Sequence, residues 1–376
     1  MTQVPTQEWR FSALDTLFFK ESRPIEAVGG AQLQSVFPPS ARTLIGAIRT
    51  AIGEAQQVDW NAYAREPEHP LKAVMGDADS LGPLCFAGPF LVKDGKRLYP
   101  APLALLHAKV VEKASNADRL TCLLPSKEAT ASDLGTVRLP KKRDPLLGAK
   151  PLENSWITAQ GLTAFLKGEL PDYAAVLRPS QLFVGEERLG IGRNPATHTT
   201  GDGLLYQTHH VRPMDDVGVG IVVRGLALGN VAQKGMTRLG AEGRLASWTC
   251  APAADLPAVK IKGKQVVLVL LTHARFTRGW LPDGFEMQTL ANGQTVWEGE
   301  LHGVGLRLIS CVLGKPVREG GWDLVNRAPR PMDSLVPAGS CYFCEFTGGA
   351  QAGTLHGLQI GQDISYGRGE IAVGNW

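Results

Sequence analysis

The last 24 residues constrain the fold of this chain most, because six glycines lie in the stretch GTLHGLQIGQDISYGRGEIAVGNW, residues 353–376. A glycine cluster of this density indicates a backbone with positive φ angles, or a backbone that another molecule approaches closely. Tyr366 and Arg368 lie among these glycines, so backbone N–H groups, a cation and an aromatic ring occur together. Such a set suits a phosphate chain with unstacked bases. A Gly-rich hairpin that closes a sheet has the same pattern, and the residues alone leave both interpretations open.

The rest of the composition favours a sheet-rich protein of two domains. The 376 residues include 43 glycines and 25 prolines, which favour short strands and turns over long helices. Lys and Arg number 39 against 36 Asp and Glu, so any nucleic-acid contact must come from local clustering of cations. The N-terminal residues lack the pattern of a signal peptide, and the longest apolar run, residues 266–271, is too short to span a membrane. We therefore expect a cytoplasmic protein without membrane contact, and the scattered cysteines indicate free thiols.

One segment in the first part of the chain has clear helical periodicity. Residues 40–55, SARTLIGAIRTAIGEA, place Leu44, Ile48 and Ile52 on one stripe, and Ser40 after two prolines is suited to cap the N-terminus. Arg42 and Arg49 are seven residues apart and share nearly one face of the helix. They could bind one partner together, or they could be a solvated pair.

Most other segments are predicted to be strands. Patterns typical of strands occur at residues 8–19, 84–92, 97–111, 182–191, 203–212, 217–228, 264–273, 300–312 and 340–347. A short helix is expected at 158–168. Residues 112–155 are polar, contain Lys127 and the cluster Lys141, Lys142 and Arg143, and have no sustained period, which predicts an inserted loop outside the core. We expect two domains, residues 1–180 and residues 181–376.

Three constellations could carry chemistry, and each has a simpler explanation. Cys341 and Cys344 have the spacing of a metal motif, but an offset of three on a strand sends the thiols to opposite faces. Asp215 and Asp216 could hold metal ions in a palm-type site, although a loop between two strands explains them better. His209 and His210 could supply an acid or base for RNA cleavage, but only one of two consecutive strand residues can face a site.

Several stretches together resemble the third subunit of the Cmr complex, a type III-B CRISPR effector, within the RAMP superfamily. In chain order they are DTLFFKESRPIE, FPPSARTLIGAIR, EERLGIGRNPATHTTGDGLLY followed by HVRP, LGAEGR, VPAGSCYFCEF and ISYGRGEIAVGNW. Each stretch is a weak signal alone, whereas their joint order is specific. The resemblance covers residues 10–376 apart from the polar insertion.

The resemblance implies an α+β protein of two ferredoxin-like, RRM-like domains with antiparallel sheets and long inserted loops. It implies a subunit that cleaves nothing, requires no cofactor or metal, and holds the 5′ repeat-derived tag of the guide RNA in antiviral defence. The implied protein partners are the large polymerase-cyclase subunit and the backbone RAMP subunits, and target RNA is contacted indirectly. The residues that match RNA-facing segments of the family are Ser35, Arg42, Thr43, Arg49, Arg193, Tyr366, Gly367, Arg368 and Gly369. The loops at 192–202 and 232–244 are a second candidate surface.

Two other functions are open on the residues. A metal-independent endoribonuclease that processes repeat RNA would use His209 or His210 as acid or base. A palm-type nucleotidyl cyclase would use Asp215 and Asp216.

Overall fold

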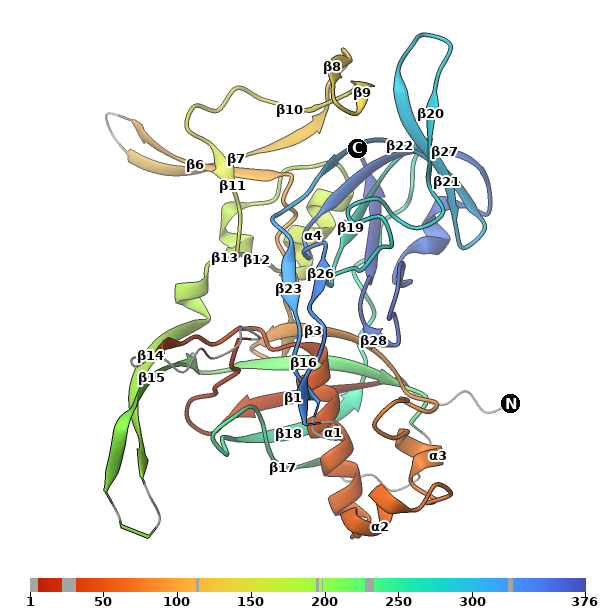
Figure 1. Cartoon of the computed structure of the whole chain (residues 1–376). Coiled ribbons are helices and arrows are strands. Elements are labelled where there is room, and N and C mark those ends of the chain that lie inside the picture. The colour runs from red at the N-terminus through yellow and green to blue at the C-terminus, as the bar shows by residue number, and fades with distance from the viewer. Residues whose placement is uncertain are drawn as a thin grey trace. The chain divides into compact units, whose positions relative to one another are not determined.

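The computed structural model describes residues 6–21, 32–112, 115–193, 196–197, 199–226, 233–323 and 327–376 (Figure 1). The chain divides into two compact units that interleave along the sequence. Unit 1 comprises Met1–Lys96, Pro179–Ala254 and Arg318–Asp333, and unit 2 comprises Arg97–Arg178, Asp255–Val317 and Ser334–Trp376. These units differ from the expected domains 1–180 and 181–376. Residues 97–178 belong to unit 2, and residues 318–333 belong to unit 1. A sequence pattern predicts strands, but it does not show which unit an inserted segment joins.

An antiparallel sheet organises unit 1. Its strands lie in the order β17 (Lys234–Arg238), β18 (Leu245–Pro252), β1 (Gln7–Ala13), β16 (Val217–Arg224) and β3 (Cys85–Lys93). One face of β1 carries Trp9 and Phe11, which are fully buried, and Trp9 stacks on Trp248 of β18 with ring centroids 4.5 Å apart. The alternation of these rings with polar residues is what a half-buried antiparallel strand requires.

The expected helix is confirmed as α1 (Ala41–Ala55), which packs on this sheet beside β3 and β17. Leu44, Ile48 and Ile52 are fully buried, as the spacing predicted. Two short helices follow, α2 (Trp60–Arg65) and α3 (Lys72–Met75). Asp59 caps α2 by accepting hydrogen bonds from the backbone N–H groups of Asn61 and Ala62.

A long hairpin of β14 (Phe183–Arg193) and β15 (Thr200–Pro213) extends from unit 1, and β2 (Gln32–Leu33) pairs with β15 in parallel (Figure 1). A second, shorter hairpin is formed by β24 (Trp322–Asp323) and β25 (Ala328–Pro329). Both β14 and β15 fall where the sequence predicted strands.

Unit 2 contains a second antiparallel sheet. Its order is β20 (Glu286–Thr289), β21 (Thr295–Leu301), β22 (Val304–Val312), β27 (Cys341–Gly349), β19 (Gln265–Leu270) and β29 (Ile371–Asn375). Helix α4 (Ala159–Leu166) packs against β29, and Thr158 caps it through a 3.2 Å hydrogen bond from the Gly161 N–H. Gly168, in a left-handed conformation, follows the end of this helix as expected.

The polar residues 112–155 were expected to form an inserted loop outside the core. Most of this insertion forms strands instead. One sheet has the order β10 (Pro140–Lys142), β7 (Ser115–Pro125), β6 (Leu105–Glu112) and β11 (Lys150–Pro151). A separate hairpin of β8 (Thr130–Ser132) and β9 (Gly135–Val137) lies between β7 and β10 in the chain. Cys122, Val137 and Leu152 are buried. These few apolar residues anchor the insertion on the core of unit 2, which a search for sustained periodicity does not detect.

Short elements complete the described chain: β4 (Lys96–Arg97), β5 (Tyr99–Pro100), β12 (Trp156–Ile157), β13 (Val176–Leu177), β23 (Val317–Glu319), β26 (Asp333–Leu335), β28 (Tyr366–Gly367) and the 3-10 turns Tyr173–Ala175, Pro179–Gln181 and Ala352–Leu355. Overall, an α+β class with mostly antiparallel sheets and few helices is confirmed. No helix among the described residues is long and apolar enough to cross a membrane.

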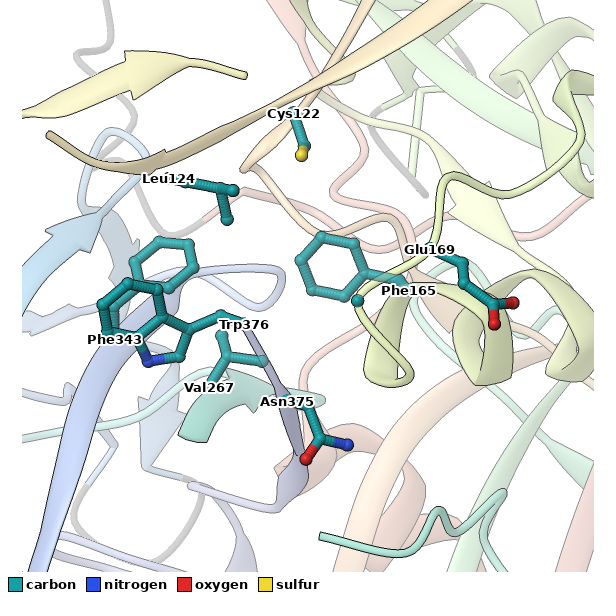
Figure 2. Close-up of a pocket in the computed structure, with 9 residues that line it drawn as sticks. Cys122, Leu124, Phe165, Glu169, Val267, Phe343, Asn375 and Trp376 are labelled. Carbon is teal, nitrogen blue, oxygen red and sulfur yellow. The ribbon is translucent and has the colours of Figure 1, made fainter. Parts of the chain in front are cut away.

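Unit 2 also contains a small apolar pocket (Figure 2). Phe165, Phe343, Trp376 and Cys122 line it, and Glu169 lies at its margin. The Trp376 indole packs edge-on against Phe343 at 5.7 Å between ring centroids and donates a 3.0 Å hydrogen bond to the Cys344 carbonyl. This pocket lies between α4 and the sheet and belongs to the packing of the core.

Candidate nucleic-acid interface

The outer face of α1 presents the first group of predicted RNA contacts. Arg42 and Thr43 are partly exposed in the first turn, and the Thr43 hydroxyl lies 3.2 Å from the Ser40 hydroxyl. Gly46 follows one turn later, is exposed, and has no atom within 4 Å of the position that a Cβ would occupy. A glycine inside a helix costs about 1 kcal/mol relative to alanine. No packing among the residues that the structure describes explains that cost, so Gly46 leaves room for a close approach from outside.

Arg49 lies on the same helix but is engaged by the chain itself. Its guanidinium donates to the backbone carbonyls of Met75 at 2.7 Å, Asp77 at 2.5 Å and Ser80 at 2.9 Å. These contacts hold the loop after α3 against α1. The prediction that Arg49 contacts RNA stays untested.

Ser35 has a local structural contact. Its hydroxyl accepts a 3.2 Å hydrogen bond from the Phe19 backbone N–H. Ser35 also bridges to Lys20, which ties the segment after β1 to the segment leading into α1.

The terminal Gly-rich loop holds its arginine inside the structure. The Arg368 side chain is only 5% exposed and donates a 3.0 Å hydrogen bond to the carboxylate of Asp363, which also pairs with Arg275 at 2.8 Å. Glu370, two residues after Arg368, is buried and pairs with Arg97. The described geometry gives this cation a role in fixing the loop, and its predicted contact with RNA stays untested.

The neighbouring residues follow the same pattern. The Tyr366 N–H donates to Asp363, the Gly367 N–H to Ile364 and the Gly369 N–H to His273, each through the backbone carbonyl, at 2.9, 3.0 and 2.9 Å. Tyr366 is half-buried. Their roles as RNA contacts stay predictions, and the interpretation as a closing hairpin fits their hydrogen bonds.

Arg193 ends β14, where its backbone pairs with Thr200. Its side chain, together with residues 194, 195 and 198 of the neighbouring loop, lies outside the described residues. The structure therefore adds nothing on Arg193 as an RNA contact.

A backbone motif that the sequence analysis overlooked occurs once in each unit. In unit 1 the Ala241 N–H donates a 2.8 Å hydrogen bond to the Phe18 carbonyl, and in unit 2 the Gln362 N–H donates one of the same length to the Arg275 carbonyl. A Cβ on the preceding glycine, Gly240 or Gly361, would lie 2.4 Å from that same carbonyl oxygen. We call these two segments, 240–242 and 361–363, the Gly-x-acid turns.

The acid of each turn has an unusual backbone conformation and a charged environment. Glu242 and Asp363 have φ angles of 57° and 54°. Glu242 accepts a 3.0 Å hydrogen bond from His210 and lies 3.6 Å from Arg244. The repeated letters Gly-Ala-Glu and Gly-Gln-Asp were the available signal, but three letters are too few to show a repeat.

His210 is the centre of a network at the base of the long hairpin. It is fully buried, its Nδ1 lies 3.0 Å from the Thr16 hydroxyl, and its ring stacks on Phe18. Burial, reinforced by the positive charge of Arg244, lowers the pKa of His210. Both ring nitrogens make contacts within the chain, and the expectation that one of the two histidines faces inward is confirmed.

Three arginines converge on one carboxylate beside His210. Asp15 is 3.1 Å from Arg188, 2.9 Å from Arg212 and 3.5 Å from Arg244. The hydrogen bond from Arg188 is the main cause that lowers the pKa of Asp15 to about 2. Glu186 also pairs with Arg188 and Arg212 at 2.6 Å each. With Glu242, which lies beside Arg244, three carboxylates face three guanidinium groups, and this balance of charge suits a structural junction better than a phosphate site.

The other candidates for chemistry have structural placements. Cys341 and Cys344 lie in separate core clusters on opposite faces of β27, as expected, and burial raises the pKa of Cys341 to about 12 and that of Cys344 further. Asp215 and Asp216 lie in the turn between β15 and β16, as expected. Within the part of the chain that the structure describes, no group of three or more His, Cys, Asp or Glu side chains could hold a metal ion.

Comparison with known proteins gives one strong match. A family model described as "CRISPR-associated protein (Cas_Cmr3)" matches residues 9–376. Two solved structures of the type III-B Cmr-beta complex bound to cognate target RNA, one of them with AMPPnP, contain a similar chain at 14% sequence identity. The alignments cover 90% of this chain and 86% of the other, with TM-scores of 0.47 and 0.46. No curated protein matches the sequence.

Proposed function

Since the chain belongs to the Cas_Cmr3 family of CRISPR-associated proteins, we propose that it is a non-catalytic RNA-binding subunit of a type III-B CRISPR ribonucleoprotein. In this role it holds the 5′ repeat-derived tag of the guide RNA and bridges the large polymerase-cyclase subunit to the backbone subunits in the cytoplasm. The observation that carries the proposal is the family match over residues 9–376.

The strand orders support a ferredoxin-like origin for both units, which we include in the proposal. In unit 1 the order β18-β1-β16-β3 places the fourth, first, third and second core strands side by side, and in unit 2 the order β29-β19-β27-β22 does the same. This is the order of a split βαβ arrangement. Among the described residues, the α-helices that connect consecutive core strands of their own unit are α1, α2 and α3, and all three lie between β1 and β3 of unit 1.

The outer face of α1 is the surface that we assign to the RNA. Arg42 supplies a cation, Thr43 a hydroxyl, and Gly46 a place where a sugar-phosphate chain can approach the helix backbone. Single-stranded RNA needs such backbone contacts while its unstacked bases are read elsewhere.

Binding of a tagged guide RNA at several salt concentrations tests this surface. Arg42→Ala should weaken binding and reduce the slope of log K against log salt by roughly 0.7, the contribution of one phosphate contact on a single strand. Gly46→Ala should weaken binding as well, although it stabilises the free chain by about 0.5–1 kcal/mol through helix propensity. Loss of RNA affinity in a more stable protein separates contact from misfolding.

Arg65→Ala removes an exposed cation from α2 and is the matched control, with binding expected to stay unchanged. Equal affinity and equal salt slope for all three variants would remove α1 from the interface. The same RNA should stay intact in EDTA, and specific cuts that disappear in His209→Ala would contradict the non-catalytic role.

A further inference from the structure

Strand β17 is the last strand at one end of the unit 1 sheet. Its hydrogen bonds to β18 are made by alternate residues, as shown by the 2.8 Å bonds from the Cys250 N–H to Gln233 and from the Leu239 N–H to Arg244. The intervening residues Lys234, Met236 and Arg238 therefore point their backbone N–H and C=O groups away from β18. The edge of β17 offers a row of donors and acceptors in the register of a further strand.

The side chains at this edge are also exposed. Lys234, Met236 and Arg238 are exposed along β17, and Met236 is 56% accessible. On the same sheet face Leu245 of β18 lies opposite Arg238 and is 41% exposed. Leu14, at 55%, donates its N–H to the Leu245 carbonyl, so three apolar side chains lie close together on the open face, opposite the face that α1 covers.

The pattern of charges selects among possible occupants. Two copies of β17 paired antiparallel about Met236 would place Lys234 opposite Arg238, and directly opposed like charges destabilise a strand pair. Edge lysines protect natural sheets from self-association in this way. The same two cations attract a strand that carries acidic residues on both sides of an apolar one.

The backbone favours a polypeptide over a nucleic acid. The β17 edge alternates N–H donors with C=O acceptors, and another strand satisfies both, whereas phosphates accept only. The exposed residues of β17 and of this face of β18 include no aromatic ring on which a base could stack.

We propose that the β17 edge accepts an extended segment of a partner protein by strand addition, with acidic residues placed against Lys234 and Arg238 and an apolar residue against Met236. The partner's source rests on the proposed function, because the candidates are the other protein subunits of the effector complex. The contact itself requires no RNA.

Amide hydrogen exchange tests the proposal on the full chain in three states: alone, with tagged guide RNA, and assembled with the protein subunits encoded beside it. Exchange at the Met236 and Arg238 amides should slow at least 100-fold in the protein assembly and stay unchanged with RNA alone. Unchanged exchange in the assembly overturns the inference, and slowing by RNA alone does so as well, by making RNA the occupant.

Met236→Pro removes one outward N–H from the edge without touching a bond to β18, and an edge strand tolerates proline at such a position. It should weaken assembly at least tenfold. Met287→Pro is the matched control, because Met287 is 61% exposed on the terminal strand β20 and also points its N–H away from its neighbour. Equal effects of the two prolines would overturn the inference.

A double variant, Lys234→Glu with Arg238→Glu, leaves the backbone intact and should weaken assembly to a similar extent even if Met236→Pro fails to fold. A chain that assembles normally with this charge reversal contradicts the proposal. If the chain binds tagged RNA and its subunits but the edge amides exchange freely, only the edge inference fails. If it binds neither, the proposed function fails too.

Discussion

The two Gly-x-acid turns have the same backbone but different charge partners. In unit 1 the carboxylate of Glu242 binds a buried histidine, whereas in unit 2 the carboxylate of Asp363 binds Arg275 and the buried Arg368. The surrounding backbone also repeats, since Leu17 and Val211 exchange two hydrogen bonds in unit 1 as Ala274 and Val336 do in unit 2. Backbone geometry is thus common to the two units, and the side chains that stabilise each turn have diverged.

The largest expected effect tests whether the two backbones are equivalent. Gly240→Ala and Gly361→Ala each force a Cβ to within 2.4 Å of a carbonyl oxygen at φ angles of +85° and +88°. Each should lower the free energy of unfolding of its unit by about 3 kcal/mol, the upper range for local backbone strain. Urea denaturation followed by tryptophan fluorescence measures the loss.

Gly243→Ala is the control for these variants. Gly243 has a φ of +64° but no atom within 4 Å of its Cβ position, so only the conformational cost of about 1 kcal/mol remains. If Gly240→Ala is as stable as Gly243→Ala but Gly361→Ala is not, the backbone of the unit 1 turn relaxes around the added Cβ and the backbone of the unit 2 turn does not.

The next effect separates the two charge arrangements. Asp363→Ala leaves the guanidinium of Arg368 buried without its carboxylate and should cost about 3 kcal/mol. Glu242→Ala leaves the neutral His210 N–H without this acceptor and removes one of the two carboxylates near Arg244, which keeps Asp15, so it should cost about 1–2 kcal/mol. Thermal or urea unfolding of both variants gives the difference.

Glu286→Ala controls for the loss of an ordinary surface ion pair. Glu286 pairs with Arg278 at 2.5 Å but is 66% exposed, so its removal should leave the free energy of unfolding nearly unchanged. If Asp363→Ala behaves like this control, Arg368 has found another partner and the unit 2 turn does not depend on its acid.

Sequence patterns predicted the elements whose own residues decide their structure. The stripe of Leu44, Ile48 and Ile52 predicted α1. The opposite placement of Cys341 and Cys344 followed from strand geometry alone. These inferences need only local spacing, which the sequence contains.

The parts that the sequence did not show depend on contacts between distant segments. Arg368 lies among glycines, and Arg49 lies on a helix face. Nothing in those two stretches indicates that Asp363 would bind Arg368, or that the carbonyls of the 75–80 loop would bind Arg49. The β6–β11 region is ordered because a few apolar residues, such as Val137, reach the core of unit 2. The sequence does not distinguish an exposed arginine from a buried one, so a list of candidate RNA contacts chosen by residue type includes both.

The smallest effect is a pH dependence that should differ in origin between the two units. Burial lowers the pKa of His210 in unit 1 and of His356 in unit 2, so each folded unit holds a neutral imidazole. Above about pH 6.5, the ordinary histidine value, the imidazole is neutral in folded and unfolded states and its contribution is constant. Below it the unfolded chain binds a proton that the folded chain does not, and stability falls by at most about 1.4 kcal/mol per pH unit for each histidine.

His210→Gln should flatten this dependence for unit 1 and His356→Gln for unit 2, measured as unfolding free energy between pH 7 and pH 5. The groups around His210 do not confuse the result, because hydrogen bonds from Arg188 and Arg212 lower the pKa values of Asp15 and Glu186, whose contributions are lost only at more acidic pH. His209→Gln, on the same strand as His210 but only half-buried, is the control for the substitution itself. A steeper fall toward pH 5 in His210→Gln than in the unsubstituted chain would mean that Glu242 holds a histidine already protonated in the folded state, and the two turns would then both stabilise buried cations.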